Sequence, residues 1–275
     1  MNKKKIIFFD IDGTLVTEDK IIPESTKKAI QYLREKGHYT VIATGRAPNM
    51  FQHIQKELNI SSYIAFNGQL VVCDGIEVHA ESLDSTFIHD ITTFAAQHNH
   101  AIGFENHKDL TITHADNPLA KDNFLQLKLD YPAVDPDYYK QNTVNQLNLF
   151  CTEQEELIYK EKYTDYKFVR WGYFGADVLP ADSSKAIGIQ KFIEYAGAAM
   201  ENVYAFGDGE NDIEMLSSVK NGVAMGNAVS ELKDIASYVT TDCDQYGILY
   251  GLQHLWLIEE PSFENDYFDL SKAKI

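Results

Sequence analysis

The sequence has few cysteines, and its apolar runs are short. Its three cysteines, Cys73, Cys151 and Cys243, form no C-x-x-C pair, which argues against a disulfide framework and a thiolate zinc site. No apolar run is long enough to span a bilayer, and the start "MNKKKIIFF" meets Asp10 too early for a secretory signal. We therefore expect a cytoplasmic protein that neither crosses a membrane nor leaves the cell by that route.

Positive charge is also scarce. There are 24 Lys and Arg residues against 41 Asp and Glu, for a net charge of -17. This balance argues against nucleic acid or an anionic membrane as a partner, because both are bound chiefly through Lys and Arg. A small anion remains compatible with the sequence if local groups or a metal overcome the negative field. The length of 275 residues allows one large domain or two ordinary ones; the oligomeric state is left open, and a monomer is plausible.

The first part of the chain alternates between strand and helix patterns. We expect strands at 5–9, 39–44 and 62–66, and helices at 23–37 and 48–58. This alternation predicts an α/β fold, with a doubly wound parallel sheet covered by helices on both faces.

The alternation breaks at residues 70–80, where two β-rich arms flank the turn Asp74-Gly75 and predict a hairpin. Beyond it, we predict an inserted α+β domain over residues 83–182. Its expected elements are a helix at 85–97 and extended segments at 101–105, 110–114, 144–151 and 173–180.

The α/β pattern then resumes, so the first domain is discontinuous and comprises residues 1–82 and 183–275. Its later elements are a helix at 183–197, a strand at 203–206, alternating elements at 212–219, 222–226, 228–236 and 238–240, and a closing helix at 247–258. The tail from residue 259 has no clear period, and we expect it to be loosely held.

Polar residues follow three core strands, at the ends where ligands bind in an open parallel sheet. They are Asp10 and Asp12, Thr44, Gly45 and Arg46, and Asp208 and Asp212. Two carboxylates about 5 Å apart repel by roughly 3 kcal/mol at an effective dielectric of 20. One lysine cannot neutralise four acids, whereas an all-oxygen site suits Mg²⁺. The sequence therefore predicts a magnesium site.

Other sites fit less well. An EF-hand loop needs Gly at its sixth position, where counting from the two acidic segments gives Leu15 and Ile213. A dinucleotide loop would have its third glycine where Asp212 stands. The serine hydrolase, P-loop and H-E-x-x-H motifs are absent. We assign no role to four histidines of the inserted domain, His98, His100, His107 and His114.

Four segments together resemble the motifs of the haloacid dehalogenase (HAD)-like hydrolases. They are "FFDIDGTLV", "IATGR", the lysine of "SSKAIG" and "GDGENDIEML". "FNG" and "GVAMGNA" are similar to the Cof-type subgroup, whose inserted domain is a type IIB (C2) cap. The resemblance implies a Rossmann-like core with a cap, and a Mg²⁺-dependent phosphatase of small phosphomonoesters that acts through an aspartyl-phosphate.

The resemblance also implies roles for single residues. Asp10 would be the nucleophile, and Asp12 the general acid and base. Asp10, Asp208, the backbone carbonyl of Asp12, and Asp212 directly or through water would hold the metal. The phosphate would be bound by Thr44, Gly45, Lys185 and Asn211.

The leaving group would be recognised by the cap together with Arg46 and Asn67 of the core. Glu105, Asn106 and His107 are cap candidates that the sequence does not rank. Sugar phosphates and phosphorylated cofactors of the pyridoxal or flavin type are the expected substrates. A phosphomutase, or a non-catalytic sensor of a phosphorylated metabolite, are the alternatives that the sequence leaves open.

Overall fold

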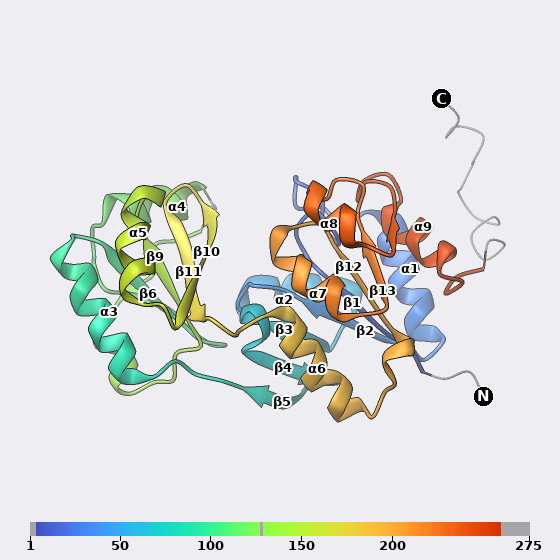
Figure 1. Cartoon of the computed structure of the whole chain (residues 1–275), viewed down its shortest axis with the longest axis horizontal. Helices are drawn as coiled ribbons and strands as arrows, with labels where there is room; N and C mark the ends of the chain where they lie inside the picture. The colour runs from blue at the N-terminus through green and yellow to red at the C-terminus, as the bar shows by residue number, and fades with distance from the viewer. Residues whose placement is uncertain (1–3, 127–128, 260–275) are drawn as a thin grey trace.

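The computed structural model describes residues 4–126 and 129–259, and it contains two sheets lying beside each other along the long axis of the molecule (Figure 1). The strands of the eight-stranded sheet lie between residues 6 and 80 and between 203 and 239, and those of the six-stranded sheet between 101 and 180. The predicted fold class, a doubly wound core with an inserted α+β cap, is confirmed. We call the two parts the core and the cap.

The core sheet has the strand order β14-β13-β12-β1-β2-β3-β4-β5. Its strands are β1 Ile6–Phe9, β2 Tyr39–Ala43, β3 Ser62–Ala65, β4 Leu70–Cys73, β5 Ile76–Ala80, β12 Val203–Gly207, β13 Asn221–Ala224 and β14 Tyr238–Val239. All neighbours pair in parallel except β3-β4 and β4-β5. The antiparallel arms β4 and β5 form the predicted hairpin, in which Asp74 and Gly75 have φ of +48° and +79°.

The central strand β1 is apolar throughout because both of its faces are covered. Ile7 and Phe9 pack in the cluster that includes α1, α2 and α9, whereas Ile6 and Phe8 pack in the cluster that includes α6, α7 and α8. These helices are α1 Glu24–Glu35, α2 Pro48–Leu58, α6 Lys185–Ala196, α7 Ile213–Ser218, α8 Ser230–Ile235 and α9 Gly247–His254. A continuous apolar strand is typical of a parallel sheet buried on both sides.

Some helix ends follow local sequence signals. Ser184 caps α6 by accepting from the backbone N–H of Ile187, and Gly197 ends that helix with φ of +60°. The closing helix was predicted to reach Ile258, which is wrong: α9 ends at His254, and Trp256 has φ of +56°, which an α-helix does not contain. The expectation for the tail, made from residue 259, falls almost entirely on residues 260–275, which lie outside the described part. Within the described ranges, no helix has the length and apolar character needed to cross a membrane.

The cap sheet has the order β10-β11-β9-β6-β7-β8 and pairs antiparallel except between β7 and β8. Its strands are β6 Ala101–Glu105, β7 Leu110–Ile112, β8 Ala133–Val134, β9 Gln146–Phe150, β10 Tyr166–Gly172 and β11 Gly175–Pro180. The cap helices are α3 Ser85–Gln97, α4 Pro118–Gln126 and α5 Glu153–Lys162. The helices α3 and α5 cover one face, and α4 covers part of the other, where Phe124 contacts Phe150.

The sequence patterns predict no helix or strand for the segments that form α4, α5, β8 and β10. The helix α5 shows why, because its segment "EQEELIYKEK" is mostly charged and buries only Glu156 and Tyr159. Such a helix carries little apolar periodicity, and its position is decided by the tertiary structure.

Candidate active site

Polar side chains follow the carboxyl ends of three neighbouring core strands. Asp10 follows β1, Thr44 follows β2, and Asp208 follows β12. The backbone N–H of Asp10 donates to the carbonyl of Phe206 at 3.0 Å, and that of Thr44 donates to Ile64 at 2.9 Å. These bonds continue the sheet beyond its strands and align the polar residues at one edge, where open α/β sheets bind ligands.

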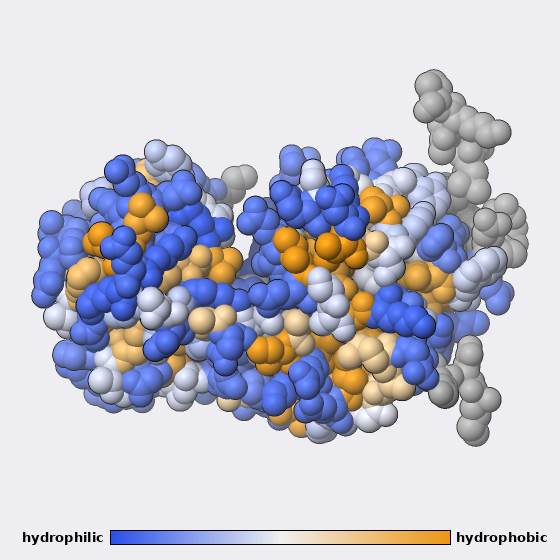
Figure 2. All heavy atoms as spheres, viewed as in Figure 1, coloured by the Kyte–Doolittle hydropathy of each residue, from blue (hydrophilic) through white to orange (hydrophobic). Residues whose placement is uncertain are grey.

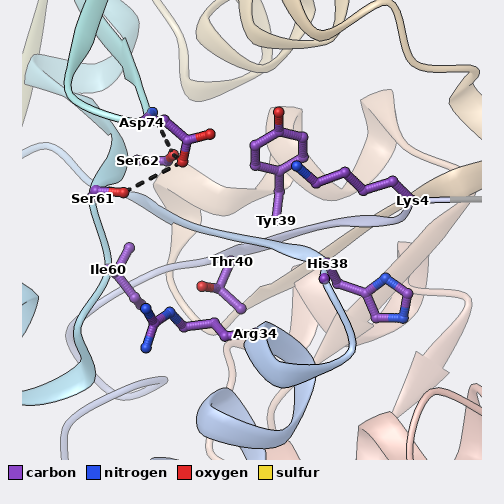
Figure 3. A pocket seen from close by; sticks show the side chains of 10 residues that line it. Lys4, Arg34, His38, Tyr39, Thr40, Ile60, Ser61, Ser62 and Asp74 are labelled. Atoms are coloured by element: carbon purple, nitrogen blue, oxygen red, sulfur yellow. Dashed lines mark hydrogen bonds between the residues drawn. The ribbon is translucent and has the colours of Figure 1, made fainter.

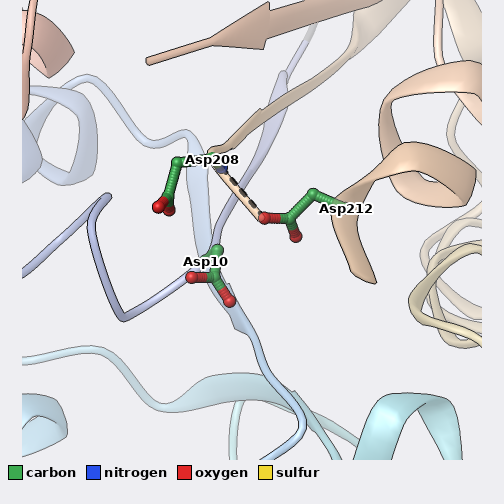
Figure 4. Close-up of side chains that lie close together, drawn as sticks. All are labelled: Asp10, Asp208 and Asp212. Carbon is green, nitrogen blue, oxygen red and sulfur yellow. Dashed lines mark hydrogen bonds between the residues drawn. The ribbon is translucent and has the colours of Figure 1, made fainter. Parts of the chain in front are cut away.

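Three carboxylates meet at this edge. Asp10, Asp208 and Asp212 each offer an oxygen within 4.8 Å of the others, and Figure 4 shows their side chains pointing toward one another. Asp212 lies in the turn after β12, and its Oδ2 accepts from the backbone N–H of Asp208 at 2.9 Å and of Gly209 at 3.0 Å. The turn itself therefore fixes the orientation of the Asp212 carboxylate.

Lys185 supplies the positive charge of this cluster. It is the first residue of α6, its side chain is fully buried, and its Nζ lies 2.6 Å from Asp10 Oδ1 and 2.7 Å from Asp212 Oδ1. Burial lowers the pKa of Lys185, but the two carboxylates outweigh this effect and hold its pKa above the usual value. Burial raises the pKa of Asp208 to about 6, against a hydrogen bond from Thr14. One ammonium group is thus shared between two acids, and the third acid has no comparable partner among the contacts of the described residues.

The Asp12 carboxylate lies outside this acidic cluster. It accepts from Arg46 through Nε at 2.8 Å and through a terminal nitrogen at 2.5 Å, and from Lys20 at 2.6 Å. Burial raises the pKa of Asp12, but the charge of Arg46 and the hydrogen bonds from Lys20 and Arg46 outweigh it, so this pKa lies below its ordinary value. Asp12 is therefore ionised in this arrangement.

A tight turn at Gly13, directly after Asp12, passes beside Asp208 of the acidic cluster. Gly13 has φ of +75°, and a Cβ built on it would lie 2.1 Å from Asp208 Oδ2. Only glycine therefore lets the turn pass beside Asp208. Thr14 donates to Asp208 Oδ1 at 2.8 Å, and Asn227 donates to the carbonyl of Gly13 at 2.8 Å. Thr14, Asn227 and Lys20 were missed by the sequence analysis: the first two lie inside the quoted motifs, and Lys20 carries no sequence signal.

The loop after β2 packs against the Phe66–Gly68 segment. A Cβ on Gly45 would lie 2.9 Å from Asn67 Nδ2, and the backbone N–H of Asn67 donates to the carbonyl of Thr44 at 3.1 Å. Phe66 and Asn67 both have φ of +51°, a strained backbone that structures retain mainly at functional positions. The structure thus brings the predicted residues Thr44, Gly45 and Asn67 together.

Asn211 has a looser environment. It belongs to the turn Glu210–Asp212, its side chain is exposed, and its Oδ1 would lie 2.7 Å from a Cβ on Gly209. Asn211 directly precedes Asp212 in the sequence, and its exposed side chain is accessible to a ligand from the solvent.

A family model described as haloacid dehalogenase-like hydrolase matches residues 7–252. The chain belongs to this family. It is 42% identical over 255 residues to the putative phosphatase YkrA of Bacillus subtilis strain 168, covering 93% of this chain and 99% of the relative. The predicted membership, including the Cof-type subgroup, is confirmed.

Two solved structures resemble this chain over 93% of its length. A hypothetical protein from Geobacillus kaustophilus HTA426 is 45% identical, with a TM-score of 0.89, covering 93% of this chain and all of that one. The HAD subclass IIB sugar phosphatase BT4131 is 30% identical, with a TM-score of 0.81 and the same coverage. These similarities span both the core and the cap.

The acidic cluster of this hydrolase fits a hard divalent cation. Its donors are carboxylate oxygens, the ligands that Mg²⁺ prefers. Burial raises the pKa of both Asp10 and Asp208, and neighbouring carboxylates raise them further. A cation held by Asp10 and Asp208 would offset this repulsion, since Lys185 makes its direct contacts with Asp10 and Asp212 and reaches Asp208 only through its charge.

A cavity of about 230 Å³ lies at the opposite edge of the core sheet (Figure 3). Residues at the start of β2 and before β3 line it, together with Lys4, Arg34 and Asp74. None of the predicted site residues lines this cavity, and the cluster of potential metal ligands found among the described residues lies at the carboxyl edge instead. The candidate active site is therefore the carboxyl edge.

The cap candidates differ in their contacts. The Asn106 amide donates to the Tyr138 hydroxyl at 2.7 Å and to the Thr143 carbonyl at 2.9 Å. These bonds stabilise the loop that contains Asn106. His107 is exposed, whereas Glu105 is 3% exposed and lies on the cap sheet. Of the three candidates, only Glu105 is a buried ionisable group.

Proposed function

We propose that this protein is a Mg²⁺-dependent phosphatase that hydrolyses small phosphomonoesters through an aspartyl-phosphate on Asp10. The observation that carries the proposal is the contact of one buried ammonium group, Lys185, with Asp10 at the edge where Asp208 and Asp212 also converge. Membership of the HAD-like hydrolases and the resemblance to proteins named as phosphatases support this reaction class.

The first step transfers the phosphoryl group to the enzyme. An Asp10 oxygen forms a bond to phosphorus, and the bond from phosphorus to the leaving oxygen breaks. Asp12 gives its proton to that leaving oxygen. Lys185, the Thr44 hydroxyl and the backbone N–H of Gly45 stabilise the negative charge on the transferring group.

The second step releases phosphate. Asp12, then ionised, takes a proton from water as the water oxygen attacks phosphorus, and the bond between phosphorus and Asp10 breaks. The Arg46 contact holds Asp12 ionised before substrate binds. A substrate phosphate that draws Arg46 away would raise the pKa of Asp12, which prepares it to carry a proton into the first step.

Asp10, Asp208 and the backbone carbonyl of Asp12 would hold Mg²⁺, with Asp212 as a ligand directly or through water. When bound, the ion supplies positive charge that offsets the phosphoryl oxygens. Asp212 also orients Lys185, because Oδ1 contacts the ammonium group while Oδ2 is held by the backbone of the turn.

The expected substrates are small metabolites, either sugar phosphates or phosphorylated cofactors of the pyridoxal or flavin type. The similarity to a protein named as a sugar phosphatase supports the first of these classes. The net charge of -17 argues against nucleic acid or an anionic membrane as the substrate, because both are bound chiefly through Lys and Arg.

Phosphate release from p-nitrophenyl phosphate, sugar phosphates, pyridoxal phosphate and flavin mononucleotide tests the proposal, with Mg²⁺ and with EDTA. Wild type and Asp234→Asn, at an exposed position of α8, should release phosphate only with Mg²⁺, and Asp10→Asn should release none. Retained turnover in Asp10→Asn would remove Asp10 as the nucleophile. Transfer of the phosphoryl group back to substrate without free phosphate would identify a phosphomutase, and tight substrate binding without turnover would identify a sensor.

A further inference from the structure

The cavity of about 230 Å³ at the amino edge of the core sheet has a wall of polar and charged side chains (Figure 3). The wall is formed by the last turn of α1, by residues at the starts of β2 and β3, by Lys4 before β1, and by Asp74 in the hairpin turn. None of these residues takes part in the proposed reaction, so that reaction does not explain the composition of the wall.

The cavity is separate from the catalytic edge. In Figure 1, β1 runs toward the cap, so the amino ends of the parallel strands lie on the side of the core away from the cap, whereas Figure 2 shows the surface indented between the two parts. Thr40 in the cavity and Thr44 after β2 are four residues apart, which is about 13 Å along an extended strand. A ligand the size of a phosphate group in the cavity therefore does not touch the catalytic residues.

The wall of the cavity is basic, in contrast to the chain as a whole. Lys4, Arg34 and His38 line it against one acid, Asp74, whereas acids outnumber lysines and arginines by 41 to 24 in the sequence. Burial lowers the pKa of His38, and the charges of three nearby lysines lower it further. The cavity thus lies in a region of positive potential within an acidic protein.

The two cations Lys4 and Arg34 have neutral partners. Lys4 Nζ lies 3.3 Å from the centre of the Tyr39 ring. With the Asn59 amide oxygen turned toward Arg34, that oxygen accepts from both terminal nitrogens of the guanidinium, at 3.0 and 2.8 Å. Among the described residues, neither cation forms an ion pair with an acid. Both positive charges are therefore held in position and remain available to an anion.

A buried hydroxyl group faces the same space. Thr40 is 5% exposed and lines the cavity, and its side chain has no hydrogen-bond partner among the residues that the structure describes. In Figure 3 its oxygen points toward the side where Ile60 and the Arg34 guanidinium lie. Buried polar groups are nearly always paired, and a polar ligand in the cavity would supply the missing partner.

We propose that this cavity binds a phosphate group, either as the free ion or carried by a small metabolite. Arg34 and Lys4 come from separate segments and approach from different sides (Figure 3), which suits a tetrahedral dianion better than a planar carboxylate, for which one guanidinium is enough. The Thr40 hydroxyl would donate a further hydrogen bond. The proposal concerns a second site and does not depend on the phosphatase function.

Asp74 opposes such a ligand, and this gives one test an opposite sign. The hydroxyls of Ser61 and Ser62 donate to Asp74 Oδ1 at 3.4 and 3.3 Å, which directs that oxygen toward the start of β3. Asp74 is exposed, so water screens its charge, and the two cations outweigh it. Asp74→Asn should therefore tighten the binding of phosphate, and asparagine tolerates the φ of +48° at this position.

NMR titration of the 15N-labelled full chain in EDTA tests the proposal. The probes are inorganic phosphate, methylphosphonate as a non-hydrolysable stand-in for an esterified phosphate, and acetate, all at one ionic strength. The amide resonances of Gly37, Thr40 and Ser61 should shift to saturation with both phosphorus compounds and not with acetate. The tighter of the two identifies the source, the free ion or a phosphate carried by a metabolite.

Variants test which side chains hold the ligand. Arg34→Gln and Lys4→Gln should each raise the Kd measured at the cavity resonances by roughly fivefold or more, because each removes a charge-assisted hydrogen bond. Asp74→Asn should lower this Kd by roughly twofold. Lys191→Gln makes the same charge change at an exposed position of α6, and should leave the Kd unchanged.

Three results would overturn the cavity site. Shifts confined to Gly45 and its neighbours would assign the phosphate to the catalytic edge alone. An equal response to acetate would show a general effect of anions without a phosphate site. The same Kd in Arg34→Gln, Lys4→Gln and Lys191→Gln would exclude the two cations as ligands. The amide spectrum of each variant shows whether it is folded, and if Arg34→Gln is not, Lys4→Gln and Asp74→Asn carry the test with their opposite signs.

Discussion

Arg46 contacts both carboxylate oxygens of Asp12, with distances of 2.8 Å from Nε to Oδ2 and 2.5 Å from a terminal nitrogen to Oδ1. The two residues lie on the loops that follow β2 and β1, and the planar guanidinium matches the carboxylate at two points. The loop after the second strand therefore controls the ionisation of an acid on the loop after the first. In the proposed mechanism this acid carries the proton of both steps.

We predict that Arg46→Gln raises the pKa of Asp12. Burial already favours the neutral carboxyl, and without Arg46 it is opposed by Lys20 alone among the groups that lower this pKa. NMR titration of the Asp12 carboxyl in EDTA, assigned with Asp12→Asn, measures the shift. Lys20→Gln should raise the pKa less, because the Lys20 side chain is 61% exposed and screened by water. Equal shifts in the two variants would contradict the dominant role of Arg46.

Lys185→Met should destabilise the protein by about 3–5 kcal/mol in EDTA, because it leaves buried Asp10 and Asp212 without their shared cation. Urea unfolding measures this loss. The control Lys191→Met changes the same residue type at an exposed position of the same helix, and should cost less than about 0.5 kcal/mol. Similar losses in both variants would show that the ion pairs of Lys185 are not the cause.

Gly13→Ala should impair Mg²⁺ binding, because its Cβ would lie 2.1 Å from Asp208 Oδ2. Gly37→Ala is a matched control: Gly37 also has a positive φ, +79°, but a Cβ there meets nothing within 4 Å. Both variants should lose about 1–2 kcal/mol of stability from the backbone conformation alone. Only Gly13→Ala should also lose the rise in melting temperature that Mg²⁺ gives the wild type. A normal Mg²⁺ response in Gly13→Ala would place the ion away from Asp208.

Glu105 should make the stability of the cap depend on pH. Its pKa is about 7 in the folded protein, against 4.5 for an ordinary glutamate, so the folded state binds its proton more tightly. Its contribution is complete below pH 4.5 and is lost as pH rises toward 7, a change of about 3 kcal/mol. Glu105→Gln should abolish this change, because the amide does not titrate.

Urea unfolding at pH 4.5 and pH 7.5 in EDTA measures the effect as the difference between wild type and Glu105→Gln. Glu161→Gln, an exposed position of α5, should follow wild type at both pH values. The same pH dependence in wild type and Glu105→Gln would show that folding does not raise the pKa of Glu105.

Local patterns predicted the core well. The continuous apolar runs "KIIFF" and "YTVIAT" are typical of strands buried on both faces. The dipeptide Asp74-Gly75 is typical of a hairpin turn. Lys185, which contacts Asp10 and Asp212, was named only through the family resemblance. The local patterns did predict which polar residues follow the strands, and the structure brings Asp10, Asp208 and Asp212 together. The carboxyl ends of parallel strands must share an edge, so chain order alone was enough to collect these groups.

The cap was less predictable. Its helix α5 has almost no apolar period. The edge strand β10 was not assigned, although it forms a hairpin with β11, the next strand along the chain. The end of α9 at His254 was also missed, since the apolar residues after it continue into the core without a helix. Hydrophobic residues show that a segment is buried. Its conformation is decided by the elements that pack against it.

By itself, the sequence determined the doubly wound core, the inserted domain and the acidic residues of one edge, because each depends on short-range periodicity or chain order. Tertiary structure alone decided the partners: Asp12 with Arg46, Asp208 with Thr14 and Asn227, and, across the cap strands, Glu105 with Gln146 and Asn148 with Asp177. Side-chain direction and strand register are set by packing between distant segments. A list of residues in chain order does not contain them.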